Sequence, residues 1–86
     1  MATKINFIDV YSFFDEMDSM MMESIMDERN ISFSMRTFGR PRFSVGYNAP
    51  FERRMAVEED KVDYALKLLF DAMKSGMITR EGKFRG

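Results

Sequence analysis

Apolar positions alternate with polar ones in several stretches of the chain, and this period of two predicts β-strands. Residues 5–13 are rich in β-branched and aromatic side chains and are apolar on both faces, as expected of a central strand. Residues 31–36 alternate strictly, which predicts a strand with one buried face. Residues 43–47 alternate after a Gly-Arg-Pro turn, so we expect them to form a hairpin with the second strand. A further short strand is expected at residues 53–57.

The first predicted strand contains one position that its pattern does not explain. With unbroken alternation, Phe7, Tyr11 and Phe13 share one face of the strand. Asp9 interrupts this face, and the pattern gives no reason for a carboxylate there.

A helical period follows and predicts an amphipathic helix that begins after Asp15 and ends near Asn30. The Asp15 carboxylate is suited to cap the first free backbone N–H groups, and Asn30 tolerates the left-handed conformation common at helix ends. The helical spacing predicts a buried stripe formed by Phe14, Met17, Met21 and Ile25. Met20, Met22 and Met26 widen the apolar arc beyond one core face. These methionines could form an adaptable binding surface, or they could loosely fill a small core.

A second amphipathic helix is predicted between Asp60 and Gly76. Asp60 repeats the capping signal, and Gly76 after a lysine is a typical helix stop. The predicted buried stripe consists of Val62, Ala65, Leu66, Leu69, Phe70 and Met73. Tyr64 and Leu68 fall outside this stripe, so either side chain could be exposed.

The order of these elements, β-α-β-β-(β)-α, predicts an α+β fold. We expect a two-layer ferredoxin-like sandwich with a mostly antiparallel sheet and both helices on one face. Residues 1–79 are expected to form a single domain, because a chain of 86 residues has no room for a second core. Residues 77–79 could add an edge strand or pack under the second helix, and residues 80–86 are predicted to be a flexible polar tail.

The absence of two residue types limits the chemistry that this chain can perform. The sequence contains no cysteine and no histidine, which argues against disulfides, zinc sites and catalytic triads built on these residues. No catalytic motif, calcium loop or glycine-rich phosphate loop is present, so we expect no metal, no cofactor and no enzymatic activity. Without a secretory signal or a long apolar run, a cytoplasmic location is the expectation.

The charges are segregated along the chain although its net charge is only −1. Residues 1–30 contain seven acidic and two basic side chains, whereas residues 31–54 contain five arginines and one glutamate. The five are Arg36, Arg40, Arg42, Arg53 and Arg54. They could bind a small anion or a nucleotide, or they could simply be solvated. Residues 40–47 interleave arginine with aromatic side chains, but an acidic chain that lacks the RNA-binding aromatic pattern argues against nucleic acid.

Several segments together resemble a known bacterial family. They are Val10-Tyr11, the sequence Glu28-Arg29-Asn30-Ile31, residues 54–60 and residues 65–69. In these segments the chain is similar to the small bacterial signal-transducing proteins. That resemblance implies a compact ferredoxin-like domain, comparable with the PII regulators, and a regulatory role without catalytic residues. The chain departs from the family at Asn30, where a glycine is common, and in its arginine-rich segment.

We therefore expect a non-enzymatic regulatory or protein-interaction module, which acts in signal transduction and forms a homo-oligomer. The candidate contact residues are Met20, Met22, Met26, Tyr64 and Leu68. The alternative is a small-anion or nucleotide receptor that uses the segment Arg36–Arg54.

Overall fold

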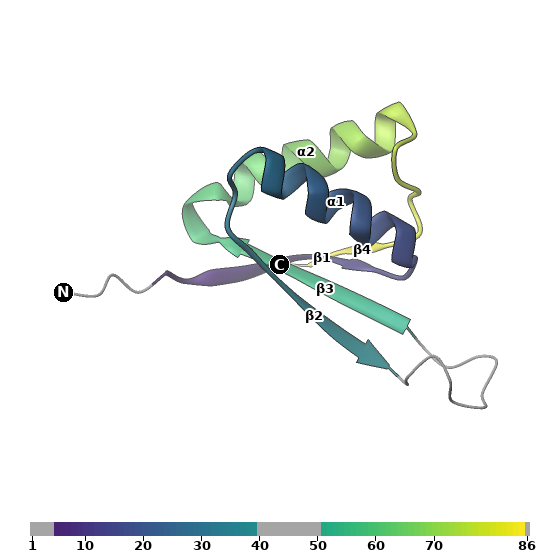
Figure 1. The fold of residues 1–86 in the computed structure, drawn as a ribbon, viewed down its shortest axis with the longest axis horizontal. Coiled ribbons are helices and arrows are strands. Elements are labelled where there is room, and N and C mark those ends of the chain that lie inside the picture. Colours follow the sequence, from purple (N-terminus) through teal and green to yellow (C-terminus); the bar gives the residue numbers. More distant parts are fainter. Residues whose placement is uncertain (1–4, 40–50, 86) are drawn as a thin grey trace.

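A computed structural model of the chain describes residues 5–39 and 51–85. Its elements are β1 (Phe7–Phe13), α1 (Glu16–Glu28), β2 (Phe33–Gly39), β3 (Phe51–Glu58), the 3-10 turn η1 (Glu59–Lys61), α2 (Val62–Ser75) and β4 (Lys83–Phe84). The strands form one antiparallel sheet in the order β2-β3-β1-β4, with both helices on one face (Figure 1). The predicted α+β class and two-layer ferredoxin-like arrangement are confirmed.

The centre of the sheet is formed by β1 and β3. β1 pairs with β3 on one side and with β4 on the other, so the prediction of a central first strand is correct. The hairpin partner of β2 is β3, which begins at Phe51 and contains the predicted short strand at 53–57. The predicted strand at 43–47 lies outside the described residues.

A bulge in β1 explains the carboxylate at Asp9. Asp9 and Tyr11 oppose successive residues of β3, so Val10 is one extra residue in β1 and the alternation of faces shifts there. Tyr11 and Phe13 therefore face the helices, whereas Asp9 and Phe7 face the opposite side of the sheet. The prediction that Phe7 shares a face with Tyr11 is wrong for this reason.

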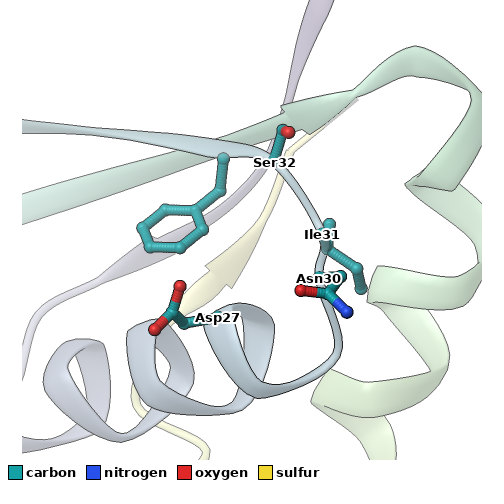
Figure 2. Close-up of a pocket in the computed structure, with 5 residues that line it drawn as sticks. Asp27, Asn30, Ile31 and Ser32 are labelled. Carbon is teal, nitrogen blue, oxygen red and sulfur yellow. The ribbon is translucent and has the colours of Figure 1, made fainter.

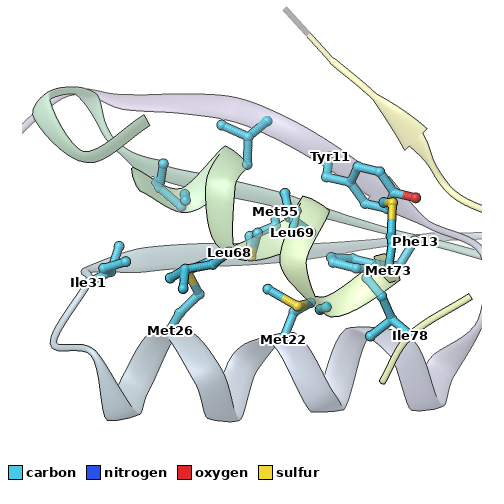
Figure 3. Close-up of a cluster of buried hydrophobic side chains, with 14 residues drawn as sticks. Tyr11, Phe13, Met22, Met26, Ile31, Met55, Leu68, Leu69, Met73 and Ile78 are labelled. Carbon is cyan, nitrogen blue, oxygen red and sulfur yellow. The ribbon is translucent and has the colours of Figure 1, made fainter. Parts of the chain in front are cut away.

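The hydrophobic core lies between the helices and the sheet (Figure 3). Its largest fully buried side chains are Tyr11, Phe13, Met22, Met26, Met55 and Leu69. On α1 the buried stripe is rotated relative to the prediction. Met22 and Met26 are completely buried, whereas Met17 and Met21 of the predicted stripe are 73% and 38% exposed.

Two buried polar residues set the orientation of α1. Asp18 is only 7% exposed, and its carboxylate accepts hydrogen bonds from the backbone N–H of Thr79, at 3.1 Å, and from the Thr79 hydroxyl. The Ser19 hydroxyl is fully buried; it donates to the Glu16 carbonyl at 2.7 Å and accepts from the Arg53 guanidinium at 3.2 Å. A pattern that assigns only apolar residues to the buried face cannot find these two positions.

α2 is also rotated from its predicted orientation. Leu68 is buried with Leu69 and Met73, whereas Phe70 is 57% exposed. The predicted cap at Asp60 is wrong, because residues 59–61 form η1 and α2 begins at Val62.

The ends of both helices and the cap of α1 follow their local sequence signals. Asp15 accepts from the N–H groups of Met17 and Asp18 at 2.8 and 3.3 Å. Asn30 and Gly76 adopt positive φ angles of 58° and 81° after α1 and α2. These three predictions are confirmed.

The fourth strand lies in the segment that was predicted to be a tail. Lys83 and Phe84 form β4 beside β1, and the Phe84 ring lies 4.8 Å from the Tyr11 ring and 4.9 Å from the Phe70 ring. The expected domain boundary at residue 79 is therefore too early. Residues 77–79 form no strand; Ile78 instead packs into the core, which was the alternative prediction.

Candidate functional site

The predicted arginine site is divided between two faces of the sheet. Arg36 and Arg54 oppose each other on β2 and β3, on the face away from the helices. Arg53 points to the helical side, where its guanidinium donates to Glu23 on α1 at 2.8 Å. Arg40 and Arg42 lie outside the described residues. The described arginines of the predicted site therefore do not form a single cluster.

The sheet face away from the helices, which we call the open face, carries a polar network centred on Glu52. Oε2 of Glu52 accepts from the Ser12 hydroxyl at 2.5 Å, from Nη2 of Arg54 at 3.0 Å and from Nη2 of Arg85 at 3.0 Å. Nε of Arg85 also donates to the Ser12 hydroxyl at 2.7 Å. This network joins β3, β1 and the residue after β4. Arg85 is not among the residues predicted for the site, because it lies in the expected tail.

These donors change the proton affinity of Glu52. The pKa of Glu52 is lowered from its usual 4.5, first by the hydrogen bond from Ser12 and then by Arg54 and Arg85, although partial burial opposes the shift. Glu52 is therefore a stable anion at neutral pH. It neutralises one of its two arginines, which leaves the network with one net positive charge.

The remaining part of the open face combines cations with an aromatic ring. The Phe38 ring lies 4.5 Å from the Arg54 guanidinium and 5.6 Å from that of Arg36. Arg36 also pairs with Asp9, with Nη2 and Oδ1 2.7 Å apart. Beside Arg36, a hollow of about 470 Å³ extends over Ala56. This is the part of the open face where a small ligand could enter.

A second hollow lies between the end of α1 and the start of β2 (Figure 2). It has a volume of about 350 Å³ and is lined by Asp27, Asn30, Ile31, Ser32 and Phe33. Asp27 is the charged residue of this lining. A single carboxylate beside neutral side chains does not make a metal or catalytic site.

Three of the five predicted contact residues cannot reach a partner. Met22 and Met26 are fully buried and Leu68 is 9% exposed, so the expectation that they are surface residues is wrong. Met20 and Tyr64 are at the surface, with exposed fractions of 51% and 38%. They lie on different helices.

The exposed apolar side chains of α1 gather on the helix face opposite its buried stripe. Met17, Met20 and Met21 are 73%, 51% and 38% exposed and have helical spacing, and Phe14 just before the helix is 44% exposed. We call these four residues the methionine face. The predicted surplus of apolar residues on α1 therefore exists, but of the three methionines assigned to it only Met20 is exposed, whereas Met22 and Met26 are buried.

Comparison of the chain with protein-family models, curated proteins and solved structures found no match. Within residues 5–39 and 51–85, no group of three or more acidic side chains is arranged to hold a metal ion. None of the helices in that part of the chain has the length and apolar character needed to cross a membrane.

Proposed function

We propose that this chain is a non-enzymatic protein-interaction module with a regulatory role, and that the methionine face of α1 is its contact surface. The observation that carries the proposal is the exposure of Met17, Met20 and Met21 on one side of a well-capped helix. Contiguous apolar surface of this kind marks binding sites more often than single exposed residues do. Methionine side chains are flexible and polarizable, so such a face can adapt to different apolar partners.

The charge of α1 indicates the chemistry of the partner. The helix contains five acidic residues and no basic residue. Asp27 and Glu28 are exposed near its C-terminal end, so the methionine face is bordered by negative charge. A basic amphipathic helix would match both the apolar strip and this border. We propose that the partner offers such a segment, in a bacterial signalling context of the kind that the family resemblance implies.

The methionine methyl groups provide a direct test. A protein labelled with ¹³C at its methionine methyl groups is titrated with a synthetic amphipathic helix of Leu and Lys. Resonances of Met17, Met20 and Met21 should shift, those of the buried Met22 and Met26 should stay nearly unchanged, and the affinity should fall with salt. The same peptide with Glu in place of Lys is the control. Absence of shifts at the three exposed methionines would refute the proposal.

Two variants test whether the peptide binds at the methionine face or at an exposed methionine elsewhere on the surface. Met20→Glu should weaken peptide binding, because it adds a like-charged group among acidic residues and removes apolar contact. Met77→Glu is the matched control, because Met77 is 49% exposed but lies after α2. Equal loss in both variants would show that the peptide does not bind at the methionine face.

The second candidate function is a small-anion receptor on the open face. Of the five predicted arginines, Arg36 and Arg54 are the described ones that could form it. Arg36 keeps 51% of its side chain exposed beside the hollow over Ala56, so a phosphate oxygen could compete with Asp9 for its guanidinium. A thermal shift with inorganic phosphate or nucleotides should then disappear in Arg36→Ala and persist in Arg53→Ala, whose guanidinium is on the other side of the sheet. No shift across a nucleotide panel would eliminate this candidate.

A further inference from the structure

The two edges of the sheet differ in their protection. β4 contains two residues, and a short edge strand is one of the usual ways to avoid pairing with another chain. β2 contains seven residues, and its register with β3 is unbroken from Phe33 to Gly39. It has no proline, no lysine and no bulge, and its one charged residue, Arg36, is paired with Asp9 on the open face. Among the described residues, no strand lies beyond β2.

The hydrogen bonds of the hairpin show which groups of β2 face outward. The N–H of Glu58 donates to the carbonyl of Ser32 at 3.2 Å, and the N–H of Ser32 donates to the Glu58 carboxylate at 2.9 Å, so the backbone groups of Ser32 point toward β3. Because this direction alternates from residue to residue along an antiparallel ladder, the even-numbered residues of β2 point their backbone groups at β3. Phe33, Met35 and Thr37 therefore point their N–H and C=O groups outward.

The helices leave this edge accessible. α1 and α2 pack on β1 and β3, and β2 extends from beneath them at the rim of the sheet (Figure 1). The side chains of β2 are half-buried at Phe33 and Met35 and exposed from Arg36 onward.

We propose that β2 pairs in antiparallel fashion with β2 of a second copy of this chain, which joins two sheets into one of eight strands about a two-fold axis. The charge pattern of the strand selects the register. A pair centred on Arg36 would place two guanidinium groups directly opposite each other, which is destabilising. A pair centred on Met35 places Arg36 opposite Ser34 of the second copy and pairs the outward groups of Phe33, Met35 and Thr37.

The chain offers a clean cross-linking test because it contains no cysteine. In the proposed register the two Met35 Cα atoms lie about 5.5 Å apart, which is within the range for a disulfide. Met35→Cys should therefore form a covalent dimer on mild oxidation, and Arg36→Cys should not. Cross-linking of Arg36→Cys alone would overturn the register, and a wild-type chain that sediments as a monomer at high concentration would overturn the dimer.

Edge variants test the dimer without touching the hairpin. Thr37→Pro removes an outward N–H and no hydrogen bond to β3, so it should raise the dimer dissociation constant at least about tenfold. Thr37→Lys provides a second disruptive variant that retains every backbone donor, and Thr37→Val is the control that should remain dimeric. An unchanged dissociation constant in both disruptive variants, with circular dichroism showing a folded chain, would refute pairing at this edge.

This inference is independent of the proposed function. Met20→Glu should leave the dimer intact, because the methionine face lies on α1 and not on β2. Loss of peptide binding with an unchanged dimer, or the reverse, therefore identifies which of the two proposals has failed.

Discussion

The polar network on the open face should make a pH-dependent contribution to stability, and Glu52→Gln isolates it. The substitution keeps the shape of the side chain but removes the charge that Ser12, Arg54 and Arg85 share. The Ser12 hydroxyl and the two guanidinium groups then donate to a neutral amide and no longer to a carboxylate. Both arginines retain positive charge without their common partner.

The expected magnitude follows from how exposed the partners are. Hydrogen bonds to buried charged groups contribute about 1.5–3 kcal/mol each, whereas exposed ion pairs contribute about 0.2–1 kcal/mol. The side chains of Arg54 and Arg85 are 25% and 32% exposed, so their pairs fall toward the lower range. We expect a total loss of about 1–2 kcal/mol, equivalent to roughly 4–16 °C in Tm for a domain of this size.

The pH dependence has a definite sign. The pKa of Glu52 is lower in the folded chain than its usual 4.5, mainly because the Ser12 hydroxyl donates to the ionised form. Its stabilising contribution is therefore complete above the unfolded pKa and is lost as the pH falls through the folded pKa. The Tm difference between wild type and Glu52→Gln should be full near neutral pH and should close at acidic pH.

Thermal unfolding followed by circular dichroism between neutral and acidic pH measures this difference. Asp71→Asn is the control, because Asp71 is an exposed carboxylate on α2, in the opposite layer of the molecule. Equal Tm values for Glu52→Gln and wild type at neutral pH would refute a stabilising role for the Glu52 charge. A Tm difference that persists at a pH where the wild-type carboxyl is protonated would also refute it.

Three further substitutions test the fold, with chemical denaturation as the measurement. Met22→Ala should cost about 2–5 kcal/mol because it leaves a cavity in the core, whereas Met21→Ala on the methionine face should change stability by about 0.5 kcal/mol or less; equal effects would contradict the rotation of α1. Gly82→Ala should cost about 1–3 kcal/mol and displace β4, because the added Cβ would clash with the Tyr11 ring and the Ser12 carbonyl; a neutral effect would show that β4 does not lie there. Asp15→Ala should cost about 1 kcal/mol through loss of the helix cap, and Asp15→Asn should retain most of it.

The features that the sequence predicted correctly depend on neighbouring residues. Asp15 caps α1 through N–H groups two and three residues away, and Asn30 and Gly76 end the helices through their own backbone conformations. The alternation that predicted β2 is likewise a property of adjacent positions. Such signals are readable because their partners lie within one or two turns of the chain.

The face that each helix buries could not be predicted from neighbouring residues. Asp18 is buried because Thr79, 61 residues further along the chain, donates to it. Ser19 is buried against Arg53, 34 residues away. Once these polar groups occupy the inner side of α1, Met22 must also point inward and Met17 outward. The sequence therefore predicts that α1 has surplus methionines but not which ones are exposed.

β4 and the Glu52 network are a second class of feature that sequence periodicity misses. A strand of two residues has no measurable alternation, and its place beside β1 depends on the contact of Phe84 with Tyr11, 73 residues earlier. Arg85 reaches Ser12 across the same separation. The bulge at Val10 is likewise invisible in the sequence, because it is defined by how β1 pairs with β3.

The methionine face and the β2 edge have a joint consequence if both proposals hold. A two-fold axis perpendicular to the sheet keeps both helical layers on one side, so a dimer presents two methionine faces in the same direction. A partner with two basic segments could then gain up to about 10²–10⁴-fold in affinity by engaging both faces. Thr37→Lys should remove this gain for a tandem peptide but leave the affinity for a single peptide unchanged. Equal losses for both peptides would mean that the edge substitution perturbs the methionine face itself, and an unchanged tandem affinity would mean that the two faces never act together.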